Sequence, residues 1–274
     1  MTEANAVSSA ASFERYSANA AENYDRYFVP AIGLPLAEQL VERAALQPGE
    51  RVVDLACGTG VVAKLAADRV GAEGAVVGVD MNLGMLAVAQ STSATGLVSW
   101  REAKAESLPL DDAGCDVVLC QMGLQFFTDK QTALREAHRV LDRSGRMLAN
   151  LPGPTPALFE VLEDALGRHL SPDVARFVAA VFSLHDESAL SGLFTTAGFG
   201  AVDVTSETPT LQLPRPGDFL WQYIHSTPLS AAVANLDEDQ RRALEADVVA
   251  GWAPHATEGG LRLDLRVTTV VARR

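Results

Sequence analysis

The sequence predicts an α/β fold with a doubly wound, mostly parallel seven-stranded sheet and helical lid insertions. First, short apolar strands alternate with helices between residues 51 and 151. Second, a strand such as 116–121 has a continuous apolar run, which is typical of a parallel sheet covered on both faces. Third, segments 152–186 and 207–260 interrupt the alternation. Ligands of such sheets bind outside the carboxyl ends of the strands, so insertions there would cover a ligand.

The core elements are predicted from the spacing of apolar residues. Residues 34–46 have helical spacing and are followed by a turn at Pro48-Gly49. Asn82 is placed to cap the helix that follows it, and Gly198 is placed to end a later helix. The predicted strands are 51–55, 75–79, 97–101, 116–121, 146–151, 201–206 and 261–271, and the helices between them are 61–69, 83–90, 130–141 and 187–197.

The two insertions are predicted to be helical. Residues 157–182 have helical spacing with an interruption at Ser171-Pro172, and residues 216–252 fit two helices. The last strand is predicted from alternating apolar residues that begin at Leu261, and a turn at Ser144-Gly145 is expected before the fifth strand.

Composition narrows the class of protein. The chain has 274 residues and a formal net charge of -13, so its field would repel a phosphate backbone and nucleic acid is not an expected partner. Cys57, Cys115 and Cys120 are sparse and odd in number, which favours reduced thiols and a cytoplasmic location. No signal peptide is seen, and no stretch approaches roughly 18 apolar residues, so no membrane partner is expected. Monomer and homodimer both remain open.

The most informative stretch is the glycine-rich turn after the first strand. Gly58 and Gly60 allow a tight turn and a close approach of ligand to backbone, at the start of a helix. Asp80 lies 20 residues after Gly60, where a dinucleotide fold places its ribose-binding carboxylate. The glycines alone fit either a dinucleotide or S-adenosylmethionine. A carboxylate at Asp54 would repel a pyrophosphate and favour a ligand with a cationic amino group and a sulfonium.

Several stretches in this order resemble a known family. They are 52–60, 77–82 with Met85-Leu86, 106–110, 115–127 and 134–148. Together they resemble the Rossmann-like class I S-adenosylmethionine-dependent methyltransferases, in particular the small-molecule subgroup similar to bacterial ubiquinone/menaquinone methyltransferases. The resemblance covers about half of the chain. It implies an enzyme with S-adenosyl-L-methionine as cofactor that methylates an O, N or C atom of a small organic acceptor by in-line displacement.

The resemblance also implies roles for individual residues. Asp54 and the backbone at Ala56, Gly58 and Gly60 would hold the methionine part of the cofactor. Asp80 would accept from both ribose hydroxyls, and Gln121 would face the amino group and the methyl-transfer centre. The adenine would meet Met81 and the backbone of Ala105, with Glu106 accepting from its amino group. Met85 would also contact the cofactor, and Tyr24 would close over it. Two departures from the family pattern are Lys104, where an acidic residue is usual, and the turn Asp142-Arg143-Ser144-Gly145.

The acceptor side is less defined by the sequence. A base is needed only if the acceptor must lose a proton. His225 is the candidate base, because it lies in an aromatic stretch of the second insertion. Trp221 and Tyr223 from the same stretch, together with Gln125, are candidate substrate contacts. The cysteines and histidines have no zinc-ligand spacing, so no metal is expected.

Each assignment has a structural alternative. Asp54 could cap a turn and Asp80 a helix, Gln121 and Gln125 could be ordinary strand-end residues, and His225 could simply pack. The aromatic residues Phe13, Tyr16, Tyr24, Tyr27 and Phe28 could be plain core. The competing functions are a non-methylating enzyme of the same fold (a cyclase or decarboxylase), a nucleic-acid methyltransferase, a non-enzymatic binding module and a dinucleotide oxidoreductase.

These assignments divide the chain into six segments. They are an N-terminal helical cap segment (1–46), the cofactor-binding core (47–151), a lid insertion (152–186), a core helix and strand (187–206), a helical lid insertion (207–260) and the final core strand (261–274).

Overall fold

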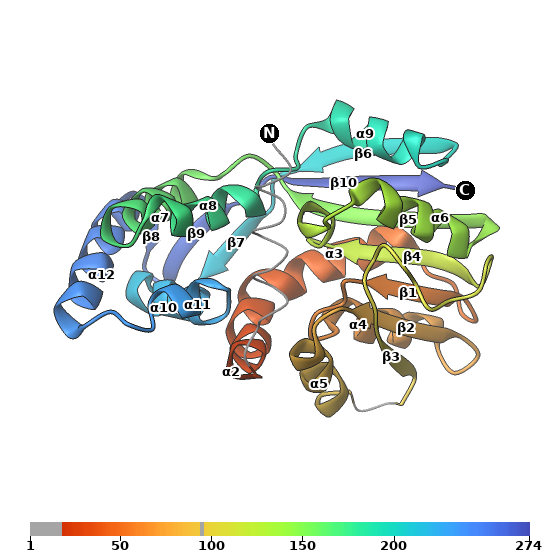
Figure 1. Cartoon of the computed structure of the whole chain (residues 1–274), viewed down its shortest axis with the longest axis horizontal. Coiled ribbons are helices and arrows are strands. Elements are labelled where there is room, and N and C mark those ends of the chain that lie inside the picture. Colours follow the sequence, from red (N-terminus) through yellow and green to blue (C-terminus); the bar gives the residue numbers. More distant parts are fainter. Residues whose placement is uncertain (1–17, 94–95) are drawn as a thin grey trace.

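The computed structural model describes residues 18–93 and 96–274. Phe13, Tyr16 and the beginning of the 1–46 segment lie outside the described residues. Figure 1 shows an α/β core on one side and a smaller lid on the other, with α2 (Ala18–Asn23) and α3 (Leu34–Ala44) lying along the boundary between them.

The core is a seven-stranded sheet in the order β3-β2-β1-β4-β5-β10-β6. The first five strands pair in parallel, whereas β10 runs antiparallel to both β5 and β6. This confirms the predicted α/β class with a mostly parallel sheet. The strand order reverses at β1, which lies between β2 and β4, and ligands bind at the carboxyl ends of such neighbours. The strands are β1 (Arg51–Leu55), β2 (Ala75–Asp80), β3 (Val98–Glu102), β4 (Cys115–Gln121), β5 (Leu141–Pro152), β6 (Ala201–Glu207) and β10 (Val267–Arg273).

Helices cover both faces of the sheet because the strands are apolar on both sides. In β4, Val117 and Leu119 pack with helices α3 and α4, whereas Val118 and Cys120 pack with α6 and α9 on the opposite face. Asn82 caps its helix as predicted, since its side chain accepts a hydrogen bond of 3.0 Å from the Met85 amide. The core helices are α4 (Val61–Val70), α5 (Leu83–Ser91), α6 (Lys130–Val140) and α9 (Glu187–Thr196).

The fifth strand is longer than the sequence predicted. The turn expected at Ser144-Gly145 lies inside β5, because the pairing with β4 shifts register between Cys115 and Val117. The Asp142 side chain accepts a hydrogen bond from the Ser144 amide at 3.1 Å, which stabilises the backbone at this register shift.

Two sequence predictions that concern the lid were wrong. The segment 207–260 is not purely helical, because it also contributes β7 and β8 to a three-stranded antiparallel sheet. The alternation from Leu261 is not one core strand either: β9 completes the lid sheet, and the chain then crosses to β10 of the core. The lid contains α7 (Ala157–His169), α8 (Pro172–Val181), β7 (Thr210–Leu213), α10 (Pro216–His225), α11 (Leu229–Ala232), α12 (Glu238–Trp252), β8 (Ala256–Thr257) and β9 (Gly260–Asp264).

The lid and the N-terminal cap share one hydrophobic core. Ile32 and Leu36 are buried in the same cluster as Trp252 of α12, whose indole N–H donates to the Leu158 carbonyl at 2.7 Å. Ile32 lies in the π-helical segment η1 (Tyr24–Gly33), which joins α2 to α3. The N-terminal cap therefore packs with the lid, and its last helix, α3, is followed directly by β1 of the core. Across the described ranges, no helix combines the length and apolar character that crossing a membrane requires.

Candidate active site

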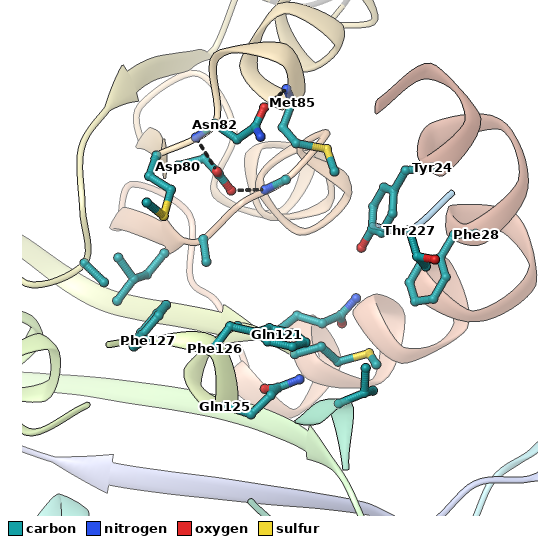
Figure 2. Close-up of a pocket in the computed structure, with 18 of the residues that line it drawn as sticks. Tyr24, Phe28, Asp80, Asn82, Met85, Gln121, Gln125, Phe126, Phe127 and Thr227 are labelled. Carbon is teal, nitrogen blue, oxygen red and sulfur yellow. Dashed lines mark hydrogen bonds between the residues drawn. The ribbon is translucent and has the colours of Figure 1, made fainter. Parts of the chain in front are cut away.

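A cavity of about 410 Å³ opens at the carboxyl ends of the core strands. One side is formed by loops that follow β1, β2, β3 and β4 of the core. The other side is formed by η1 and by lid elements, among them α7, α8, α10 and β9. Figure 2 shows this division, with Asp80 and Met85 on one side and Tyr24, Phe28 and Thr227 on another.

The glycine-rich turn borders the core side of the cavity. Ala56 and Gly58 line the cavity in the left-handed region, at φ 58° and 55°. Gly60, at φ 84°, closes the turn by donating to the Cys57 carbonyl at 2.8 Å, and α4 begins directly after it. Gly60 itself does not line the cavity, because the Trp100 ring packs against its backbone. Of the three predicted backbone contacts, the structure brings Ala56 and Gly58 to the cavity.

Asp80 ends β2 and lines the cavity beside this turn. Its Oδ2 accepts from the Gly58 amide and its Oδ1 from the Asn82 amide, both at 2.8 Å (Figure 2). Burial raises the pKa of Asp80, and the backbone N–H groups of Asn82, Gly58 and Met81 oppose that shift. A carboxylate has about four acceptor positions, so these backbone groups leave some capacity for a ligand hydroxyl. The carboxylate is therefore held in place by backbone and can still accept from a ligand.

Asp54 lies behind the turn instead of on the cavity wall. It is 1% exposed, and its Oδ2 accepts from the Ala63 amide of α4 at 2.9 Å. Burial raises its pKa to about 8; the Ala63 N–H lowers this pKa, and the charge of Asp80 raises it. Direct contact with a ligand, as expected from the sequence, does not fit this position. Asp54 can therefore attract a cationic ligand only at a distance, through the electrostatic field of its carboxylate. Its hydrogen bond to the Ala63 amide stabilises the start of α4.

The predicted adenine-side residues are brought together at one end of the cavity. Met81, Met85, Ala105 and Glu106 all line it. The Glu106 carboxylate accepts from the Asp129 amide at 3.1 Å, so it also joins this wall to the start of α6. These residues offer two thioether side chains, a backbone edge and a carboxylate, which suit a purine ring.

Gln121 lines the cavity, but its amide is already engaged. Its Nε2 donates to the Gly33 carbonyl at 2.8 Å, and its Oε1 accepts from Asn150 at 3.4 Å. The side chain therefore ties the end of β4 to the N-terminal cap. This differs from the expectation that Gln121 faces a ligand amino group, and only its remaining hydrogen-bonding capacity is left for that role.

Tyr24, predicted to close over the cofactor, lines the cavity beside the glycine turn. A Cβ added at Gly58 would lie 3.8 Å from its ring, and the ring stacks on Phe28 with centroids 4.6 Å apart. Figure 2 shows its hydroxyl pointing into the cavity. Burial raises the pKa of Tyr24, and the charges of Asp80 and Asp54 raise it further.

The lid side of the cavity is aromatic and was only partly predicted. Tyr223 of α10 lines the lid side, and Gln125 lines the cavity from the loop after β4; their contact with a substrate stays a prediction. The sequence analysis gave no role in the cavity to most of the apolar residues there, among them Phe28, Phe159, Phe177, Phe182 and Leu263. The available signal was the recurrence of phenylalanine in an insertion expected to cover the strand ends.

Trp221 and His225 do not line the cavity, contrary to expectation. They lie four residues apart on α10 and stack on each other with ring centroids 5.9 Å apart. The Trp221 indole N–H donates to Glu245 of α12 at 2.8 Å. Tyr223 lies between them in sequence and therefore on the opposite face of the helix, where it meets the cavity. Burial and the nearby Arg241 lower the pKa of His225.

Two negative observations bear on the chemistry of the cavity. All five histidines of the chain belong to the described residues, and none of them lines the cavity. Within residues 18–93 and 96–274, no three His, Cys, Asp or Glu side chains cluster in a way that could hold a metal ion.

The strand order, and the cavity at the carboxyl ends of the strands, are those of a Rossmann-like fold. A family described as "Methyltransferase domain" matches residues 53–149. A ubiquinone/menaquinone biosynthesis C-methyltransferase of Xanthomonas oryzae pv. oryzae (strain MAFF 311018) is 47% identical over 110 residues, which cover 39% of this chain and 44% of that protein. A protein of the same description from Shewanella sp. (strain ANA-3) is 32% identical over 184 residues, covering 61% of this chain and 73% of that protein.

The chain therefore belongs to the class I S-adenosylmethionine-dependent methyltransferases. Within that class it is similar to the ubiquinone/menaquinone biosynthesis C-methyltransferases, although the match to the Xanthomonas protein spans less than half of that protein, at 44%. Among solved structures, phosphoethanolamine N-methyltransferase 2 of Haemonchus contortus in complex with S-adenosyl-L-methionine has a TM-score of 0.62 at 18% identity. The match covers 95% of this chain and 58% of that one, and it shows the shared fold.

Proposed function

We propose that this enzyme transfers a methyl group from S-adenosyl-L-methionine to an O, N or C atom of a small organic acceptor enclosed under the lid. The observation that carries the proposal is the composition of the cavity. A carboxylate and a glycine turn stand on the core side, and aromatic side chains stand on the lid side of the same space. A nucleoside-bearing donor and an apolar acceptor would thus meet within one cavity.

The residues present fit the cofactor. Asp80 offers two oxygens to a ribose diol, and Gly58 leaves its surface open because it has no Cβ. Met81 and Met85 would pack against adenine, with Ala105 and Glu106 at its edge. When bound, S-adenosylmethionine supplies an electrophilic methyl group: the acceptor forms a bond to the methyl carbon, the carbon–sulfur bond breaks, and its electron pair stays on sulfur.

The chain's own contribution would be alignment and exclusion of water. Tyr24 and Phe28 cover the cavity from the cap, and Phe159 and Tyr223 cover it from the lid. Holding two reactants in an enclosed, oriented arrangement lowers the barrier of a bimolecular displacement substantially. A general base at His225 is not supported by its position. Burial raises the pKa values of Tyr24 and Tyr223, so both phenols stay protonated and are not available to take a proton.

The remaining features concern partners and location. The net charge of -13 disfavours a nucleic-acid acceptor, and a lidded cavity favours a small molecule. We propose a cytoplasmic location from the three free, buried cysteines, and either a monomer or a homodimer. No contact among the described residues favours the cyclase or decarboxylase alternative.

The proposal is tested by calorimetry and by a methyl-transfer assay. S-adenosylmethionine and S-adenosylhomocysteine should bind the wild type, NADH should not, and Asp80→Ala should weaken binding by about 100-fold because two charge-assisted hydrogen bonds are lost. Asp68→Ala removes an exposed carboxylate of α4 and should bind like the wild type. With methyl-labelled cofactor and a panel of small acceptors, label should reach an acceptor in proportion to the S-adenosylhomocysteine formed. Failure of the cofactor to bind would refute the proposal.

A further inference from the structure

Gln125 is a buried side chain of the cavity wall whose two amide atoms are both left without hydrogen-bond partners. It is 5% exposed, and neither its Nε2 nor its Oε1 has a hydrogen-bond partner. Buried polar groups are nearly always satisfied, so such an amide needs an explanation. Since Gln125 also lines the cavity, a ligand can supply the missing partner.

The position of Gln125 indicates that its missing hydrogen-bond partner is a group of the acceptor and not of the cofactor. It lies in the short helix η2 (Leu124–Phe126), which follows β4 and packs against α8 of the lid. Figure 2 shows it beside Phe126 and Gln121, away from Asp80 and Met85. Its neighbour Gln121 is tied to Gly33 and Asn150, so of the two glutamines Gln125 keeps its whole amide for a ligand.

The loop that carries Gln125 is built to hold it there. Met122 takes a left-handed backbone, at φ 50°, and its amide donates to the Asn150 carbonyl at 2.9 Å. A Cβ added at Gly123 would lie 2.8 Å from Ala56, so the loop packs closely against the glycine turn. The loop therefore holds the side-chain amide of Gln125 near the place where the glycine turn of the core meets the lid.

The surroundings of Gln125 limit the charge of its partner. The charged side chains lining the cavity are Asp80, Lys104, Glu106 and Asp129, and all come from core loops on the cofactor side. The lid and cap instead present residues such as Phe28, Phe159, Phe177 and Leu263. A charge buried among these lid and cap residues would have no counter-charge from the protein beside it and would be strongly unfavourable.

We infer that Gln125 is the specificity residue for the acceptor, and that it recognises one carbonyl or hydroxyl group on an otherwise apolar, uncharged molecule. The amide both donates and accepts, and a hydroxyl can satisfy both atoms, whereas a carbonyl satisfies Nε2. The aromatic walls suit a flat body. This inference rests on the proposed methyl transfer and names the chemical class of its acceptor.

The test uses three probes of similar shape on protein saturated with S-adenosylhomocysteine: 2-naphthol, naphthalene and 2-naphthoate. Dissociation constants are measured by probe fluorescence for the wild type, Gln125→Leu, Gln125→Met and the control Gln90→Leu, whose glutamine is exposed on α5. The wild type and the control should prefer 2-naphthol to both other probes by about tenfold or more. Both Gln125 variants should lose the preference for 2-naphthol over naphthalene.

Thermal stability gives a second readout. Because the Gln125 amide has no partner, Gln125→Leu or Gln125→Met should melt at the same temperature as the wild type or higher. A lower melting temperature in both would show a structural role and overturn the inference. So would a preference for 2-naphthol that survives in both variants, a preference for 2-naphthoate, or no binding of any probe. Absence of S-adenosylhomocysteine binding would instead overturn the proposed function itself.

Discussion

The Trp100 ring of β3 packs on the backbone of Gly60, so that a Cβ at this glycine would overlap the indole. Gly60 also has φ 84°, a conformation that side chains rarely adopt. The second glycine of the turn is therefore required by packing and by backbone conformation, not by contact with the cavity.

Gly60→Ala should destabilise the protein more than Gly49→Ala. Gly49 has a matching φ of 88° and nothing within 4 Å of an added Cβ, so it isolates the backbone cost of about 1–2 kcal/mol. In Gly60→Ala, the clash of the added Cβ with Trp100 should lower the free energy of unfolding by a further ~1–3 kcal/mol. The melting temperatures of both variants measure the difference, and Gly60→Ala combined with Trp100→Ala should cost less than the two changes summed. Equal loss in the two glycine variants would contradict the role of Trp100.

Asp54→Asn should stabilise the free protein at pH 8 and weaken its response to the cofactor. The folded-state pKa of Asp54, about 8, lies above the ordinary value of 3.8. Its contribution to stability is thus fully present below about pH 4 and is lost as pH rises through 8, because the folded state then holds a buried charge. Asparagine can still accept from Ala63 and removes that charge.

The measurement is the melting temperature of both proteins between pH 5 and 9, with and without S-adenosylmethionine. Without ligand, the variant should gain at least ~2 °C over the wild type at pH 8 and little at pH 5. With ligand, the wild type should gain more than the variant, because its ionised carboxylate favours a cation. A variant that is less stable at every pH would show that Asp54 only caps the turn.

The core could be predicted from the sequence because each of its elements has a clear period and a local signal. Strand β1, for example, was predicted at its observed bounds, and the Asn82 cap was predicted from its position alone. Of the cavity-lining positions, Gly58 and Asp80 were predicted from the glycine turn and the spacing that follows it, and Ala56 from the family resemblance. The pairing of β1 with β2 brings these strand ends together.

The lid could not be predicted in the same way. Strand β7 has only four residues, too few for a reliable period, and its partner β9 lies about 50 residues later in the chain. The helix α10 was predicted, but periodicity does not tell which of its faces meets the core. That is why Trp221 and His225 were expected in the cavity, whereas Tyr223 alone of the three lies there.

His225→Ala should leave catalysis nearly unchanged. The imidazole stacks on Trp221 on the far face of α10, and the residue does not line the cavity. Once an acceptor is found, the rate of S-adenosylhomocysteine formation should stay within about twofold of the wild type, with the same pH profile. A tenfold loss, or loss of one limb of the pH profile, would restore His225 as the base. Tyr223→Leu, on the opposite face, should weaken acceptor binding and serves as the positive control.

Phe177→Ala and Asp80→Ala should separate the two halves of the cavity. Phe177 of α8 lies on the lid side, and Asp80 ends β2 on the core side. Phe177→Ala should weaken binding of 2-naphthol by about tenfold while S-adenosylhomocysteine affinity changes less than twofold, because a Phe contact is worth one to a few kcal/mol. Asp80→Ala should do the reverse in calorimetry. Parallel loss of both ligands in either variant would contradict the division.

Ser226→Ala should loosen the cap over the cavity. The Ser226 hydroxyl donates to the Asn23 carbonyl at 3.0 Å, and the Asn23 amide donates to the His225 carbonyl at 3.4 Å, so the end of α10 holds the end of α2. Loss of a buried hydrogen bond costs about 1 kcal/mol, or a drop of ~2–4 °C in melting temperature. Hydrogen exchange should quicken in residues 18–33, and S-adenosylhomocysteine should dissociate several-fold faster.

Ser183→Ala is the matched control. It removes a local hydrogen bond within the lid, from the hydroxyl to the Ala180 carbonyl at 2.8 Å, and should leave both rates unchanged. Equal effects of the two serine variants would mean that the contact between α2 and α10 does not hold the cap closed.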